Sequence, residues 1–237
     1  MKRRFDLLGL RREGKDRLAP KEGLAKYFYL LWNHAWKLIG VNLLFILFSL
    51  PVITLPAALC AMNRVLIKLV RDSNVFLWEE FRDEFKGDFL RSLPLGLLFG
   101  GLLFLGYFLL SLGMGNYTSL IGMMFFALGL VLLFFSLSRA IYAFLMRAMF
   151  SLKNRDILKN ANIMAAARGG RGLIATAIVL IGFLLAFLFF PYSLAVVILF
   201  GFSLTNYTLC FILNDPIEEK IISPWERMQK KEESLHE

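Results

Sequence analysis

The chain has 237 residues, of which 58% are hydrophobic, and its mean hydropathy is +0.62. Three long stretches contain no charged residue, namely 38–62, 92–138 and 172–212. Membrane spans have this property because a charge near the centre of a bilayer costs about 2.5–3.5 kcal/mol. This pattern excludes an ordinary water-soluble domain and indicates a polytopic membrane protein. The net charge of +9 does not indicate nucleic-acid binding, because the basic residues border the apolar stretches, as in loops that face anionic lipid.

The N-terminal segment, residues 1–23, is basic and has no apolar run directly after its start. We therefore expect no cleavable signal peptide and a retained first membrane segment. The two cysteines, Cys60 and Cys210, lie in or beside apolar segments and are too few for a disulfide framework or a metal site. We expect them to be small buried hydrophobic residues, and we expect no cofactor and no metal.

The first apolar stretch predicts a helical hairpin. A single pass over about 38–59 would place the following basic block, from Arg64 to Arg91, outside, against the positive-inside bias. An outer turn at 51–56 removes this conflict and gives one helix over about 24–50 and a shorter one over 56–71. Pro56 suits the first position of the second helix. The alternative is a re-entrant segment over 51–62, which leaves five passes.

Residues 74–92 predict an amphipathic cytoplasmic helix, in which aromatic residues recur at helical spacing opposite charged ones. We expect this helix to lie at the membrane interface or against the bundle and to present an interface or partner face. The aromatic residues are Trp78, Phe81, Phe85 and Phe89.

The two remaining uncharged runs are each about twice the roughly 20 residues that one helical span needs. Each therefore predicts two helices joined by an outer turn, around residues 113–119 in the first run and at Pro191 in the second. The expected spans are 93–112, 119–148, 172–190 and 192–212. A short cytoplasmic helix over 154–167, with Ile157, Ala161 and Met164 on one face, separates the two hairpins.

The predicted fold is therefore an all-α, polytopic membrane helix bundle with six transmembrane helices and both termini inside. Its membrane domain covers residues 24–213, between the basic cytoplasmic segment 1–23 and an acidic cytoplasmic tail, 214–237.

One candidate binding site lies on the second span, where Arg64, Lys68 and Arg71 share a helix face. Intramembrane charges indicate function by default, so these cations predict a site for an anion or a lipid headgroup. The alternative is that Arg64 pairs within the bundle while the other two cations extend to lipid headgroups. Hairpin geometry places Asn42 at the depth of Asn63 and Arg64, which predicts polar packing between them.

Arg139 and Arg147 lie two turns apart on the fourth span, and extension to the headgroups or pairing with acids of 79–88 explains them. Gly96 and Gly100 form a GxxxG pattern that indicates close helix packing.

The sequence has no phosphate-binding loop, no HExxH, no GxSxG and no paired carboxylates within a span, so we expect no enzymatic activity.

Two stretches are more distinctive than these features. The first runs Val41-Asn-Leu-Leu-Phe-Ile-Leu-Phe-Ser-Leu-Pro-Val-Ile-Thr54 and continues through Pro56-Ala-Ala58 and Arg64–Arg71, and the second is Glu80-Phe-Arg-Asp-Glu-Phe-Lys-Gly-Asp-Phe89. Together they resemble the YesL family of small bacterial integral membrane proteins, classed as a domain of unknown function. The resemblance covers about 24–213 and is strongest over 41–91.

The resemblance implies a multi-pass protein of the bacterial plasma membrane. YesL proteins are often encoded beside carbohydrate ABC importers of Gram-positive bacteria, which implies an accessory role in carbohydrate uptake. It implies no catalytic or binding residues. The leading hypothesis is a non-enzymatic accessory or scaffold component that contacts ABC importer subunits and membrane lipids. The alternatives are a permease in its own right and a protein that binds anionic lipid through Arg64, Lys68 and Arg71. The sequence indicates no oligomeric state.

Overall fold

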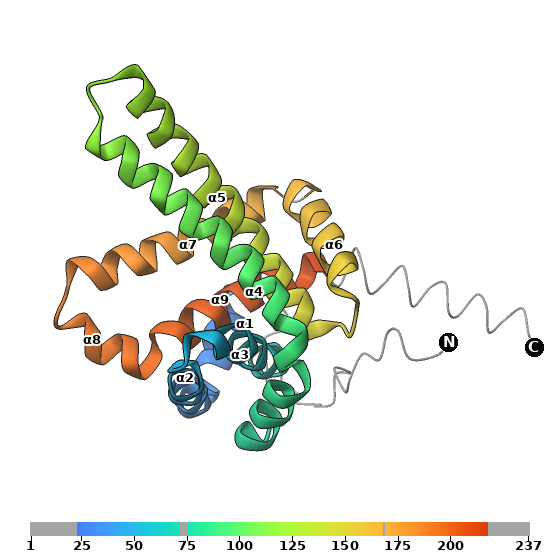
Figure 1. Ribbon diagram of the computed structural model, residues 1–237. Helices are drawn as coiled ribbons and strands as arrows, with labels where there is room; N and C mark the ends of the chain where they lie inside the picture. The colour runs from blue at the N-terminus through green and yellow to red at the C-terminus, as the bar shows by residue number, and fades with distance from the viewer. Residues whose placement is uncertain (1–22, 72–74, 168, 218–237) are drawn as a thin grey trace, which may run out of the picture.

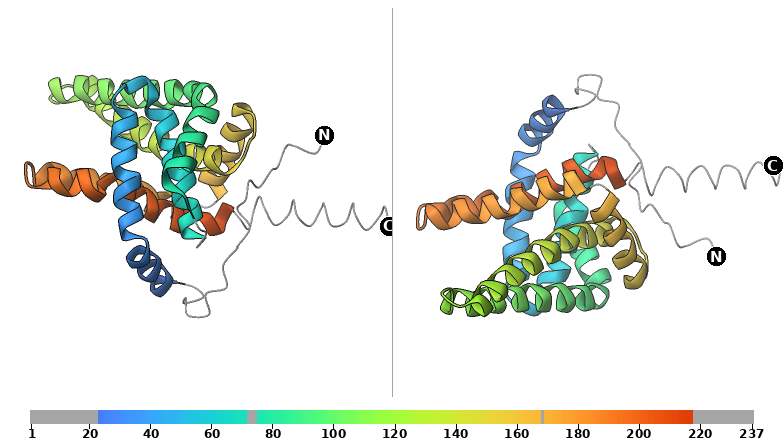
Figure 2. Two further views of the ribbon diagram at one scale, coloured as in Figure 1. Left: turned by 90° about the horizontal axis from the view of Figure 1, so that it is seen from below. Right: turned by 90° about the horizontal axis from the view of Figure 1, so that it is seen from above.

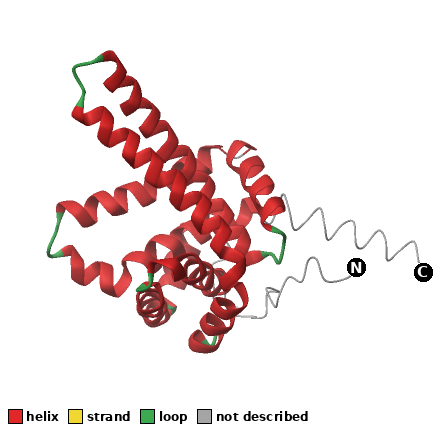
Figure 3. Ribbon diagram, viewed as in Figure 1, coloured by secondary structure: helices red, strands yellow, loops and turns green. Residues whose placement is uncertain are grey.

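In the computed structural model, the described residues, 23–71, 75–167 and 169–217, are almost entirely helical, and these ranges contain no strand (Figures 1 and 3). Five helices are long and apolar enough to cross a membrane, and a bent helix pair at the N-terminal side makes a sixth if it counts as one span. The predicted all-α membrane bundle is confirmed. The predicted segments 1–23 and 214–237 lie almost wholly outside the described residues.

The first helix is broken, which corrects the expected continuous helix over 24–50. Helix α1 (Leu24–Asn33) and helix α2 (Ala35–Ser49) meet at His34 with a bend of 72°. The backbone of His34, at φ −109° and ψ 13°, leaves the helical region. The bend lets α1 pack against α9 (Phe202–Ile217), where the Tyr27 hydroxyl shares a hydrogen bond of 2.9 Å with Thr208 Oγ1.

The expected turn between the first two spans is present. Pro51 follows α2, a 3₁₀ turn (Val52–Thr54) reverses the chain, and α3 (Leu55–Val70) begins with Pro56 in its first turn. The Thr54 hydroxyl donates to the Pro51 carbonyl at 2.6 Å and closes the turn. Most side chains of α3 are buried, so this helix lies at the centre of the bundle.

Helix α4 (Leu77–Gly115) joins the amphipathic segment and the third span into one continuous helix. Its first part runs beside α3, and its later part turns to run beside α5 (Leu120–Met149) (Figures 1 and 2). Pro94 lies inside α4, where a proline removes a backbone donor and bends a helix. The α4–α5 turn is closed by Ser119, whose hydroxyl accepts a bond of 3.0 Å from Gly122 N.

Glycines let α4 and α5 approach closely. A Cβ atom added at Gly129 would lie 2.6 Å from the backbone nitrogen of Leu110, and one at Gly106 would lie 2.8 Å from Leu133. Of the predicted GxxxG pair, Gly96 packs against Pro56 of α3, whereas Gly100 faces open space. The motif therefore supports packing through one of its two glycines.

Replacing Gly129 with alanine is expected to destabilise the protein by about 1–3 kcal/mol, because the clash is with backbone that cannot move aside. Gly100→Ala is the matched control. A Cβ there meets nothing within 4 Å, so this substitution is expected to be neutral or to stabilise the helix by up to about 1 kcal/mol. Unfolding in mild detergent measures both, and equal effects would contradict the close approach at Gly129.

The C-terminal half forms the second long hairpin. Helix α6 (Asn154–Ala167) buries the expected face of Ile157, Ala161 and Met164. Helix α7 (Gly169–Leu188) is followed by a turn at Pro191 and then by α8 (Ser193–Val196), a π-helical segment, η2 (Val197–Gly201), and α9 (Phe202–Ile217). Figure 1 shows that the tips of the α4–α5 and α7–α8 hairpins point away from the side on which α6 lies.

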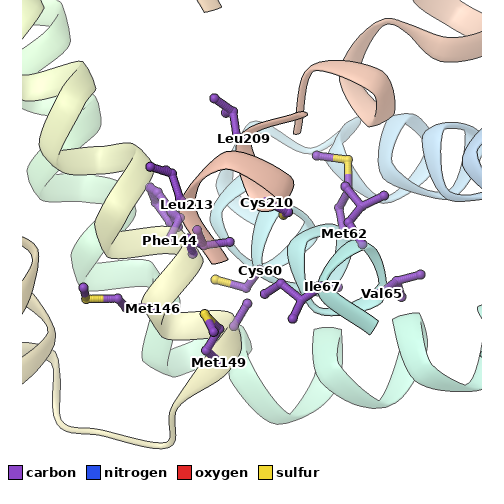
Figure 4. Packing of buried hydrophobic residues seen from close by; sticks show 14 of the residues in the cluster. Cys60, Met62, Val65, Ile67, Phe144, Met146, Met149, Leu209, Cys210 and Leu213 are labelled. Atoms are coloured by element: carbon purple, nitrogen blue, oxygen red, sulfur yellow. The ribbon is translucent and has the colours of Figure 1, made fainter. Parts of the chain in front are cut away.

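The core lies where α3, α5 and α9 meet. Cys60 from α3 lies near Phe144 and Met149 from α5 and Leu213 from α9, whereas Met62 lies on the other side of α3 (Figure 4). Cys60 and Cys210 are both buried free thiols, as expected. Outside this core, many apolar side chains of α4, α5, α7 and α8 are exposed, as in helices whose surroundings are lipid.

Candidate functional site

Charged side chains from three helices meet beside the core. Two cations of α3, three acids of α4 and one cation of α5 form a group that we call the charge cluster. Its members are Arg64, Lys68, Glu80, Glu84, Asp88 and Arg147.

The α3 side of the charge cluster follows from antiparallel packing. Lys68 forms an ion pair with Glu80, and one turn further along both helices the Arg64 Nε lies 4.0 Å from Glu84 Oε2. Acids and bases that each recur every four residues face one another when two helices run antiparallel. Arg64 is buried and also donates through Nη1 to the carbonyl of Ala148 at 3.1 Å.

The α5 side is a two-pronged ion pair between Arg147 and Asp88. Arg147 Nε donates to Asp88 Oδ2 at 2.6 Å, and Nη2 donates to Oδ1. The third guanidinium nitrogen, Nη1, donates to the Leu152 carbonyl at 2.7 Å. The two side chains are 3% and 8% exposed, so the pair is excluded from water. Of the two explanations expected for Arg147, extension to the headgroups or pairing with an acid of 79–88, the structure shows the pairing.

The three cations of the expected anion or headgroup site on α3 all contact partners within the chain, as the alternative prediction stated for Arg64. Arg64 and Lys68 face the acids of α4, whereas Arg71 turns to the last helix and donates through Nε and Nη2 to Asn214 Oδ1 at 3.1 and 3.0 Å. The three cations therefore point to different partners inside the chain. Arg64 and Lys68 share a helix face, as predicted, and that face is turned to the acids of α4.

Asn42 is also used differently from the prediction. Its side-chain nitrogen donates to the carbonyls of Val197 and Ile198 at 3.0 and 2.6 Å, and its oxygen accepts from Ser203 N at 2.8 Å. Asn42 thus binds the π-helical segment, not Asn63 or Arg64. Among the described residues, the buried Asn63 Oδ1 has no hydrogen-bond partner.

The aromatic face of the first part of α4 packs within the protein. Phe48 of α2 contacts three of the four predicted residues, with ring centroids 6.1 Å from Trp78, 5.4 Å from Phe81 and 4.8 Å from Phe85. Phe89 contacts Phe85 at 5.9 Å. Of the two expected positions, this face takes the one against the bundle, and only Trp78 is largely exposed.

The charge cluster combines three cationic side chains with three carboxyl groups. Its geometry suits it to fasten α3, α4 and α5 together. Within the described part of the chain, no three His, Cys, Asp or Glu side chains are grouped as a metal would require.

Sequence reasoning missed the carboxylates of this cluster as partners of α3. The signal was present, because Glu80, Glu84 and Asp88 recur every four residues, as do Arg64 and Lys68. The separation of 12 residues between Lys68 and Glu80 is long enough for a tight helical hairpin.

Comparison with known proteins reaches the same region. Residues 38–110 match the family model described as a protein of unknown function, DUF624. No curated protein and no solved structure matches the chain. The DUF624 match covers α3 and most of α2 and α4, and so includes the α3 and α4 members of the charge cluster, Asn42 and the turn at Pro51.

Proposed function

We propose that this protein is a non-enzymatic accessory or scaffold component of the bacterial plasma membrane, of the YesL type, that associates with a carbohydrate ABC importer. The observation that carries the proposal is the charge cluster, in which the charged groups of α3 and α5 bind acids of α4. Polar groups that satisfy one another fix the arrangement of helices and leave little for ligand chemistry. The association with an importer rests on the YesL resemblance, with which the DUF624 match over residues 38–110 is consistent.

The long hairpins support a role in assembly. The hairpin of α4 and α5 projects beyond the other helices (Figure 1), and many of its apolar side chains are exposed. In a bilayer these surfaces can be covered by lipid or by the helices of another membrane protein. The charge cluster holds α3, α4 and α5 together, and the two apolar hairpins project from this region. This arrangement suits a subunit that docks beside a transporter.

Purification from the native host in mild detergent, after cross-linking through amines, tests the proposal. Three exposed lysines, Lys86, Lys153 and Lys159, lie on α4 and beside or on α6, and we expect cross-links from them to ABC importer subunits. The variant that replaces all three with arginine keeps the charges and removes the amines, so its cross-links should disappear while co-purification persists. Recovery of the protein without transporter subunits would contradict the proposal.

The alternative function is a permease in its own right, which the solitary outcome of that purification would favour. Uptake of sugars by purified protein in liposomes would then distinguish the two. The other alternative, binding of anionic lipid by Arg64, Lys68 and Arg71, lacks support because each of these side chains contacts a partner within the chain.

A further inference from the structure

An apolar stripe without a protein partner runs along α1 and across the bend at His34. Leu24, Phe28, Trp32 and Trp36 recur every four residues and all are exposed, with Trp32 at 86% and Trp36 at 85%. Two of the four tryptophans of the chain therefore lie at the bend between α1 and α2, which we call the elbow. Tryptophan is enriched where a bilayer meets water, because its ring is apolar and its indole N–H needs a polar partner.

The opposite face of α1 holds the elbow in a fixed orientation. The Tyr207 hydroxyl donates to the Tyr27 carbonyl at 3.1 Å, and the Tyr27 ring lies 5.3 Å from the ring of Phe211. Leu30 is fully buried on the same side. Contacts on the far side of α1 therefore direct Trp32 away from the bundle, and Trp36, in the first turn of α2, is exposed just across the bend.

The elbow also carries two lysines, Lys26 and Lys37, and no acidic residue. No Asp or Glu occurs between residues 23 and 71, and neither Lys26 nor Lys37 has an ion-pair partner among the described residues. Residues 1–37 carry ten Lys and Arg and four acids. A surface that combines exposed tryptophans with unpaired lysines is complementary to anionic phospholipid headgroups, which present phosphate above an apolar layer.

We propose that the α1–α2 elbow docks on the headgroup boundary of a bilayer that contains anionic phospholipid. Trp32 and Trp36 lie at the boundary between headgroups and acyl chains, and Lys26 and Lys37 extend to lipid phosphates. The bend of 72° allows α1 to follow the membrane surface while α2 continues into the bundle. The elbow is thus a surface anchor, and α1 is not a part of the first span.

Depth-dependent fluorescence quenching tests the position of the elbow. The full chain with Trp78→Phe and Trp225→Phe, combined with either Trp32→Phe or Trp36→Phe, retains one tryptophan on the elbow. It is reconstituted in phosphatidylcholine–phosphatidylglycerol vesicles whose acyl chains carry bromine near the headgroup or near the bilayer centre. We expect quenching to be strongest with the shallow bromine.

A reporter in the middle of α7 provides the depth reference. Ile181→Trp, in a chain whose four native tryptophans are replaced by phenylalanine, should be quenched most strongly by the deep bromine, because residue 181 is exposed at the centre of its span. An elbow tryptophan that follows the Ile181→Trp pattern, or that responds to neither lipid, would overturn the proposal.

A second measurement tests the anionic partner. With bromine on phosphatidylglycerol alone, elbow quenching should exceed that with bromine on phosphatidylcholine alone by about two- to fivefold at equal lipid fractions. Lys26→Gln with Lys37→Gln should abolish this preference, whereas Lys153→Gln with Lys159→Gln, which removes two exposed lysines elsewhere, should leave it unchanged. The absence of a preference in the parent, or its persistence without Lys26 and Lys37, would refute recognition of anionic lipid.

Discussion

Replacement of Asp88 with alanine should be among the most damaging single substitutions in this protein, with a loss of about 3–5 kcal/mol in the free energy of unfolding. Asp88 binds two nitrogens of Arg147, and both side chains are buried. Its removal leaves an uncompensated guanidinium between α4 and α5. Unfolding in mild detergent, by heat or by denaturant, measures the effect.

Two further variants test whether the loss of stability arises because the remaining charge is buried without a partner. Asp83→Ala removes the partner of Arg82, and because those side chains are 67% and 43% exposed, we expect a change of at most about 1 kcal/mol. The double variant Asp88→Leu/Arg147→Met removes both charges and should recover most of the loss. A double variant as unstable as Asp88→Ala would show that the uncompensated charge is not the cause.

Replacement of Asn42 with leucine should be the second large effect. The side chain makes three hydrogen bonds to the backbone of the last span, and leucine would leave two carbonyls and one N–H without these partners. Each unsatisfied buried group costs about 1–3 kcal/mol, so we expect a total loss of about 3 kcal/mol or more. The loss is smaller if the π-helical segment relaxes into an α-helix, which re-forms the backbone bonds.

Asn206→Leu is the matched control, because it makes the same substitution on α9. The Asn206 amide donates only to the Phe202 carbonyl of its own helix, in an exposed position, so we expect a change within about 0.5 kcal/mol. Equal stabilities of Asn42→Leu and Asn206→Leu would show that Asn42 does not hold the π-helical segment in place.

Much of the helix layout could be predicted from the distribution of charge. The long uncharged runs did form two hairpins, with turns at Asn116–Thr118 and at Pro191, because a turn in the middle of such a run needs only small or helix-breaking residues. The buried face of α6 followed from helical spacing alone. These features depend on residues that are close in the sequence.

The features that were not predicted depend on contacts between distant segments. Asn42 and Val197 are 155 residues apart, and no local pattern marks a π-helical segment that exposes carbonyls to another helix. The bend at His34 likewise depends on the packing of Tyr27 against α9. The direction in which Arg64, Lys68 and Arg71 point was undetermined because a helix face identifies neighbouring side chains but not the helix that covers them.

The order in which the charged partners leave the ribosome has a consequence for biosynthesis. Lys68 is synthesised 12 residues before Glu80, whereas Asp88 precedes Arg147 by 59 residues. A nascent chain that ends before α5 therefore contains Asp88 without Arg147. Packing of α3 and α4 in their final positions would then bury a carboxylate without its cation, which is unfavourable. A shortened chain keeps the Asp88–Arg147 pair and all contacts of Arg147 only if it extends at least through Leu152.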